Sequence, residues 1–172
     1  IVDVQMNAIN GGSFAVTACK QNAKYKSNTP VINWMIKQED DMGLDTPKPY
    51  RDFEERVFRH KKTLTELIEV LVDDGKTIIG YGASTKGNVL LQFCGLTNAH
   101  IPYIAEVNEG KFGCYTPGTN IPIISEKEAR AMKPDYFLVL PWHFKNNILE
   151  REREYIESGG KFIFPLPEIE IA

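Results

Sequence analysis

The second half of the chain alternates short apolar runs with amphipathic segments, and this alternation limits the possible folds more than any other feature. From Lys76 onward, it predicts strands over residues 77–81, 101–107, 135–141 and 160–167 and helices over residues 86–95, 125–132 and 144–158. Continuous apolar strands separated by helices are typical of a parallel sheet that is covered on both faces. The sequence therefore predicts an α/β fold with a Rossmann-like, mostly parallel sheet and helices on both faces.

The first 75 residues have a different pattern. Residues 1–6 (IVDVQM) and 13–20 (SFAVTACK) alternate apolar and polar positions, which predicts an antiparallel β-hairpin. Pro30 can open a helix, and apolar residues between Phe53 and Leu71 form one stripe of a longer helix that ends at Gly75. We therefore expect a terminal hairpin (1–24), a helical connector (25–75) and a Rossmann-like domain (76–172).

Composition excludes several classes of function. The net charge of −3 gives no basic surface for a nucleic acid, and no apolar stretch approaches the roughly 20 residues of a membrane span. The three cysteines form no CxxC pair, so we expect neither a disulfide framework nor a metal site, and a reduced cytoplasm fits best. The chain opens at Ile1 inside an alternating pattern and without a Met, so we expect it to be part of a longer protein.

The stretch GYGASTKGN lies where the first predicted strand passes into a helix. Gly80, Gly82 and Gly87 allow a tight turn in which the first amides of the helix can face a phosphate. The spacing GxGxxxxG departs from the dinucleotide fingerprint GxGxxG. A turn whose glycines serve only the structure is the alternative interpretation.

Several polar residues are expected at the same edge of the sheet. Lys86 could hold a phosphate charge or be only solvated, and Ser84 and Thr85 could contact a ligand or cap the helix. Glu106 falls where a ribose-binding carboxylate would lie, and His143 could donate to a ligand or be a half-buried cap. The turn-rich loop over residues 111–123 either has a functional role or only crosses the sheet to connect two elements.

Four stretches carry a resemblance to a known family. They are AINGGSFAV, GYGASTKGN, the long run from IPYIAEVNEG to LVLPWHF, and the closing GGKFIFPLP. Over nearly the whole chain, these resemble the C-terminal region of the S-adenosylmethionine-dependent sugar C-methyltransferase family. The resemblance implies a Rossmann-like domain that follows a methyltransferase domain, with a nucleotide-linked keto-sugar bound between them. It also implies that the hairpin is the end of that upstream domain.

One position departs from the family. Members often carry HGGS where this chain has Asn10-Gly11-Gly12-Ser13, and their histidine is the proposed general base. Methylation of a carbon beside a ketone needs a base that removes the α-proton. Asn10 cannot titrate, so it could orient the substrate but not act as the base, or it could only shape the turn. The base then lies elsewhere, or the substrate class differs.

The resemblance implies different roles for this chain and for the rest of the protein. The full-length protein would use S-adenosylmethionine, and this chain would bind the sugar nucleotide, bind no methyl donor and be inactive alone. The expected substrate-binding residues are Gly80, Gly82, Ser84, Thr85, Lys86, Glu106 and His143, with Asn10 facing the reacting carbon. The alternatives are a nicotinamide-dependent oxidoreductase domain, suggested by the glycines and Glu106, and a non-catalytic docking module.

Overall fold

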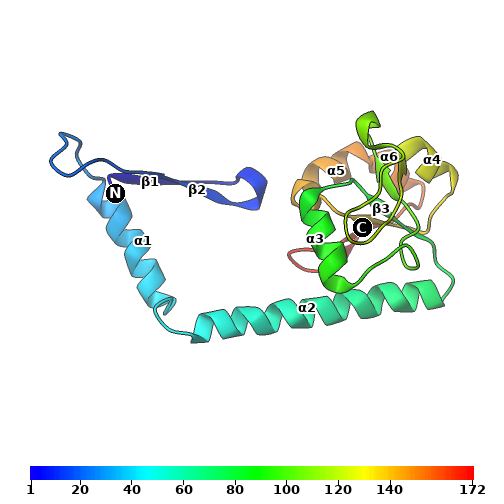
Figure 1. The fold of residues 1–172 in the computed structure, drawn as a ribbon, viewed down its shortest axis with the longest axis horizontal. Coiled ribbons are helices and arrows are strands. Elements are labelled where there is room, and N and C mark those ends of the chain that lie inside the picture. Colours follow the sequence, from blue (N-terminus) through cyan, green and yellow to red (C-terminus); the bar gives the residue numbers. More distant parts are fainter. The chain divides into compact units, whose positions relative to one another are not determined.

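A computed structural model describes the backbone of residues 1–172 and every side chain except that of Asn10. The chain forms two compact units, Ile1–Val57 and Phe58–Ala172 (Figure 1). Within the described part of the chain, none of the helices combines the length and the apolar composition needed to cross a membrane.

The first unit contains the predicted hairpin. β1 (Asp3–Asn7) and β2 (Ser13–Thr17) pair in antiparallel register and are joined through the 3₁₀ turn η1 (Ile9–Gly11). Helix α1 (Thr29–Asp41) has Pro30 in its first turn, where the missing N–H costs no hydrogen bond. The hairpin and this helix were both predicted from the sequence.

Helix α2 (Lys48–Asp73) crosses the boundary between the two units. Its C-terminal part carries Leu64 and Ile68, which are fully buried in the core of the second unit. The stripe of apolar residues in the sequence predicted this helix. The structure adds that the helix supplies part of the second core.

The second unit is built on a sheet with the strand order β5-β4-β3-β6-β7-β8. The strands are β3 (Ile78–Tyr81), β4 (Ile104–Glu106), β5 (Ile123–Ser125), β6 (Tyr136–Val139), β7 (Phe162–Phe164) and β8 (Glu170–Ile171). All neighbouring strands are parallel except β8, which pairs antiparallel with β7. The predicted α/β fold with a mostly parallel sheet is confirmed.

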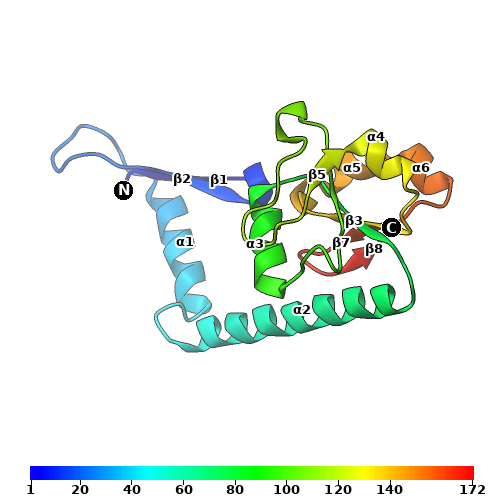
Figure 2. The ribbon, with the colours of Figure 1, turned by 45° about the vertical axis from the view of Figure 1, so that its right-hand side comes forward.

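Helices cover both faces of this sheet because successive residues of each strand point to opposite faces. Ile78 belongs to the cluster that includes residues of α2 and of α3 (Thr85–Cys94). Ile79 belongs to the opposite cluster, which packs under α4 (Glu126–Ala131), α5 (Lys145–Arg151) and α6 (Arg153–Glu157). Figure 2 shows α4, α5 and α6 together, on the side of the sheet away from α2.

Three elements differ from the prediction. The strands β5 and β8 were not predicted, because runs of three and two residues give no measurable period. The helix predicted over 144–158 is instead the 3₁₀ turn η3 (Trp142–Phe144) followed by α5 and α6. The break falls at Glu152, whose carboxylate is buried among charged partners that are described below.

Candidate functional site

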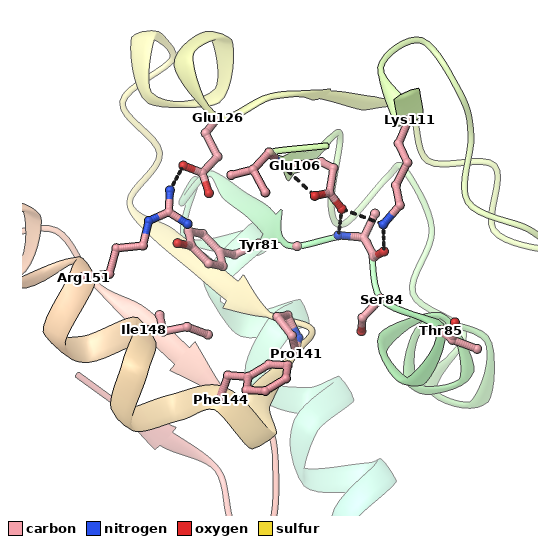
Figure 3. A pocket seen from close by; sticks show the side chains of 13 residues that line it. Tyr81, Ser84, Thr85, Glu106, Lys111, Glu126, Pro141, Phe144, Ile148 and Arg151 are labelled. Atoms are coloured by element: carbon pink, nitrogen blue, oxygen red, sulfur yellow. Dashed lines mark hydrogen bonds and ion pairs between the residues drawn. The ribbon is translucent and has the colours of Figure 1, made fainter. Parts of the chain in front are cut away.

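A cavity of about 420 Å³ lies beyond the carboxyl ends of β3, β4 and β6. β3 and β6 are neighbours, but the chain leaves them in opposite directions across the sheet, toward β4 and toward β7. Loops that diverge from two such strands leave a crevice, which is the usual ligand site of open α/β sheets. Figure 3 shows the lining side chains, and we call this space the switch-point cavity.

The glycines of GYGASTKGN allow close packing around this cavity. Gly82 has a φ of +79°, and a Cβ there would lie 2.9 Å from the ring of Pro141. A Cβ on Gly87 would lie within 3.0 Å of the Leu140 side chain, and a Cβ on Gly80 would meet Ile104 equally closely. Two of the three glycines therefore bring strands and helix together, and Gly82 also forms part of the cavity wall.

Ser84 caps helix α3. Its Oγ accepts a hydrogen bond from the Gly87 N–H at 2.9 Å and donates one to the Leu140 carbonyl at 3.1 Å. A hydroxyl in this position satisfies one of the unpaired amides at the start of a helix. Thr85, the first residue of the helix, is exposed and lines the cavity.

Glu106 is held by four donors at the end of β4. Its Oε1 accepts the N–H groups of Val107 (2.8 Å) and Asn108 (3.0 Å). Its Oε2 accepts the Ala83 N–H and the Lys111 ammonium, both at 3.0 Å. A carboxylate has about four acceptor positions, so these four hydrogen bonds occupy them. Glu106 lines the cavity, but its oxygens are engaged in hydrogen bonds to other groups of the protein.

Lys111 is a cation of the cavity that sequence reasoning did not select. Its Nζ donates to the Ala83 carbonyl at 2.9 Å as well as to Glu106, and its side chain is 42% exposed. An ammonium carries three N–H donors, so a third is available to an anion in the cavity. The only signal in the sequence was its place at the start of the turn-rich loop over 111–123.

The Glu106 contacts lead to a stability prediction. Burial raises the pKa of this carboxyl, but hydrogen bonds from Asn108, Lys111 and Val107 outweigh burial, so the pKa lies below its ordinary value near 4.5. A depressed folded-state pKa gives a stabilisation that is present above the ordinary value and is lost as the pH falls through the folded pKa. We expect Glu106→Gln to cost about 1 to 2 kcal/mol at pH 7, since charge-assisted hydrogen bonds are lost.

Urea unfolding of the parent and Glu106→Gln at pH 7 and at pH 3.5 measures this effect. The difference between the two proteins should shrink at the lower pH, because pH 3.5 lies below the ordinary pKa of the carboxyl and the stabilisation by its charge then declines. Glu109→Gln is the matched control, since Glu109 is exposed near the same turn. A cost that is the same at both pH values would contradict the role given to the Glu106 charge.

On the opposite side of the cavity, charged residues surround the buried Glu152. Its carboxylate accepts the Tyr81 hydroxyl at 2.8 Å and an Arg130 N–H at 2.6 Å. Figure 3 shows Arg151 paired with Glu126 at the cavity wall. Arg151 also lies 3.4 Å from the Glu152 carboxylate, and its side chain is 51% exposed. Burial and the bond to Glu152 raise the pKa of Tyr81, so the phenol stays a hydrogen-bond donor.

A second cavity, of about 350 Å³, shares the wall formed by Ala83, Ser84, Thr85 and Lys111. Its other lining residues come from α3, from the loop over 111–123 and from the apolar core, among them Asn88, Tyr115, Leu91 and Leu140. We call it the loop-side cavity. The β3–α3 turn thus separates two adjoining spaces.

The structure brings together some of the predicted site residues. Gly82, Ser84, Thr85 and Glu106 line the switch-point cavity, and Gly80 lies inside β3. Among the side chains that the structure describes, those of Lys86 and His143 line neither of the two cavities. Burial and the charge of Lys86 lower the pKa of His143, which favours the neutral form of its ring. The side chain of Asn10 lies outside the described residues.

Arg151 was also missed by sequence reasoning. It stands in the run EREREY, where acidic and basic residues alternate as they do on many solvated helices. Its partner Glu126 is 25 residues away and belongs to another helix. No local signal in the sequence could have selected this arginine.

Comparison with known proteins gives two findings. The family described as the C-methyltransferase C-terminal domain matches residues 8–167 of the chain. The C-methyltransferase NovU of Streptomyces niveus is 38% identical over 168 residues, which are 98% of this chain and 40% of the relative. The chain therefore spans about two fifths of the length of this curated relative.

Proposed function

Because the chain belongs to the C-methyltransferase C-terminal domain family, we propose that it is the substrate-binding part of an S-adenosylmethionine-dependent C-methyltransferase. The proposed substrate is a nucleotide-linked keto-sugar. The observation that carries the proposal is the switch-point cavity, where Lys111 and Arg151 present positive charge beside the turn that begins α3. Fixed cations and helix-start amides together favour an anionic group such as a diphosphate.

The two cations suit this task because both are already oriented. Lys111 is held by the Ala83 carbonyl and Glu106, and Arg151 is held by Glu126 and Glu152. A side chain that is fixed before binding loses less conformational freedom when the ligand arrives. The cavity can therefore fix the anionic part of a substrate while its other end extends away from the sheet.

In the proposed reaction, S-adenosylmethionine supplies the methyl group to a carbon beside the ketone. The residues of this chain do not fit the methyl donor itself. In Rossmann-type sites, an acidic residue after the second strand commonly binds the ribose hydroxyls of a cofactor, but the oxygens of Glu106 are engaged by four protein donors. The same contacts weigh against a nicotinamide cofactor. This chain would bind and orient the sugar nucleotide, and Asn10 would hydrogen-bond near the reacting carbon.

Thermal unfolding in the presence of candidate ligands tests the proposal. A ligand that binds only the folded state at about 100 times its Kd adds about 2.7 kcal/mol to the stability of that state. We expect UDP-glucose or dTDP-glucose to raise the melting temperature of the chain by several degrees and S-adenosylmethionine to leave it unchanged. The converse pattern, a shift with the methyl donor and none with any nucleotide, would rule out this division of labour.

A pair of arginine variants locates the binding site. Arg151→Gln should reduce the shift caused by the nucleotide sugar, because it removes a charge from the cavity wall. Arg153→Gln is the matched control, since Arg153 is exposed and follows two residues later. The quantity compared is the ligand-induced shift, so a lower melting temperature of the unliganded variant does not affect the result. Equal shifts in the two variants would place the ligand elsewhere.

A further inference from the structure

The loop-side cavity is lined by apolar residues and by several polar ones, among them Ser84, Thr85, Asn88, Lys111 and Thr116. Leu91, Ile123 and Leu140 are buried residues that line it. Tyr115 and Pro117 from the loop over 111–123 also line it, and Tyr115 is 61% exposed. A space lined by buried apolar side chains, an exposed aromatic ring and several hydrogen-bonding groups suits a flat heterocyclic ring.

The loop that forms one wall is held in place by hydrogen bonds at several positions. The Thr116 and Thr119 hydroxyls lie 2.6 Å apart in a buried pair, and Thr116 Oγ1 accepts the Ile121 N–H at 2.9 Å. Gln92 of α3 donates to the Pro117 carbonyl at 3.0 Å, which ties the loop to the helix. The wall is therefore formed before any ligand binds.

Asn88 is the polar residue that remains to be explained. It lies one turn after Thr85 on the same face of α3, and both residues line the cavity. Its Oδ1 is buried and has no hydrogen-bond partner among the described residues. An unpaired buried amide oxygen costs stability, so a rotation of the Asn88 carboxamide that turns this oxygen toward the cavity, where it accepts an N–H of a ligand, removes the cost.

We infer that the loop-side cavity binds the nucleobase of the ligand and that the Asn88 carboxamide recognises the hydrogen-bonding edge of the base. This inference rests on the proposed function, which places the diphosphate near the wall that the two cavities share. Each common base carries an N–H donor on its edge and an aromatic face that Tyr115 can contact. The sugar would then lie on the side of the switch-point cavity, across the β3–α3 turn.

Isothermal titration of the full chain tests the inference. The ligands are UDP, dTDP, ADP, GDP and inorganic pyrophosphate. At least one of the nucleotides should bind about tenfold more tightly than pyrophosphate, because contact of a base with an aromatic side chain typically contributes a factor of that order. Asn88→Ala and Tyr115→Ala should each remove most of this advantage and leave pyrophosphate binding unchanged.

Asn98→Ala is the matched control for Asn88→Ala, since Asn98 is exposed and lines neither cavity. A melting curve of each variant shows that it is folded, and the exposed Tyr115 provides a second variant if Asn88→Ala is unstable. Nucleotides that bind no more tightly than pyrophosphate, or variants that retain the full advantage of the base, would overturn the inference and leave the anion site in place. Absence of binding by all five ligands and by the nucleotide sugars would instead overturn the proposed function, and the inference with it.

Discussion

Replacing Gly87 with valine is expected to lower the free energy of unfolding of the second unit by about 3 kcal/mol. A Cβ at this position would lie within 3.0 Å of the Cβ of Leu140, which cannot move without shifting the end of β6. Helix α3 would have to leave the sheet, so the wall shared by the two cavities would shift as well.

Urea unfolding followed by tryptophan fluorescence measures the effect. Trp34 lies in the first unit and Trp142 packs against the core of the second, so a Trp34→Phe background makes the signal specific to the second unit. Gly95→Ala is the control, since it has a φ of +69° but open space around a Cβ, and it should cost only about 1 kcal/mol. Similar costs for the two variants would show that close packing at Gly87 is not the main constraint.

Replacing Glu152 with alanine should cost a similar amount, about 3 kcal/mol, because it leaves buried partners without an acceptor. Tyr81 is 4% exposed and would lose the acceptor of its hydroxyl, and Arg130 would lose its shortest ion pair. The side chain of Arg130 is 31% exposed, so water can solvate its unpaired charge in the variant. The expected cost therefore lies at the low end of the range for a broken buried ion pair.

Glu150→Ala is the matched control for this variant, since Glu150 is exposed near the end of α5, two residues before Glu152, and should change the stability by less than about 0.5 kcal/mol. Glu152→Gln keeps the shape and one acceptor oxygen, so its cost should fall between the two. The same fluorescence measurement ranks the three proteins. A Glu152→Ala variant as stable as Glu150→Ala would show that the buried contacts contribute nothing net to folding.

The sequence predicted the architecture because the strands at the centre of the sheet are strongly apolar. β3 and β6 are central, and their runs TIIGY and DYFLVLP stand out from the polar segments around them. The edge strands β5 and β8 are too short for a pattern. The break before α6 falls at Glu152, whose carboxylate meets partners from β3 and α4 that only the folded chain brings together.

The lining of the switch-point cavity was predicted in part, for a similar reason. The turn at Gly82 and Ser84 is local, so its glycine and its capping hydroxyl are visible in the sequence. Lys111 and Arg151 are ordinary exposed cations in sequence, and they become site residues through Glu106 and Glu126 on other elements. The reverse holds for Lys86, which has the expected residue type in the expected motif but does not line either cavity.

The β3–α3 turn forms a wall of both cavities, and Lys111 lines both as well. Ligands in the two spaces therefore act on the same few backbone and side-chain groups. If one occupant restricts the motion of this wall, the second occupant has less freedom left to remove, and the two affinities become coupled. The coupling is reciprocal by thermodynamic necessity. A change in one cavity would then alter the affinity of a group bound in the other, with no contact to that group.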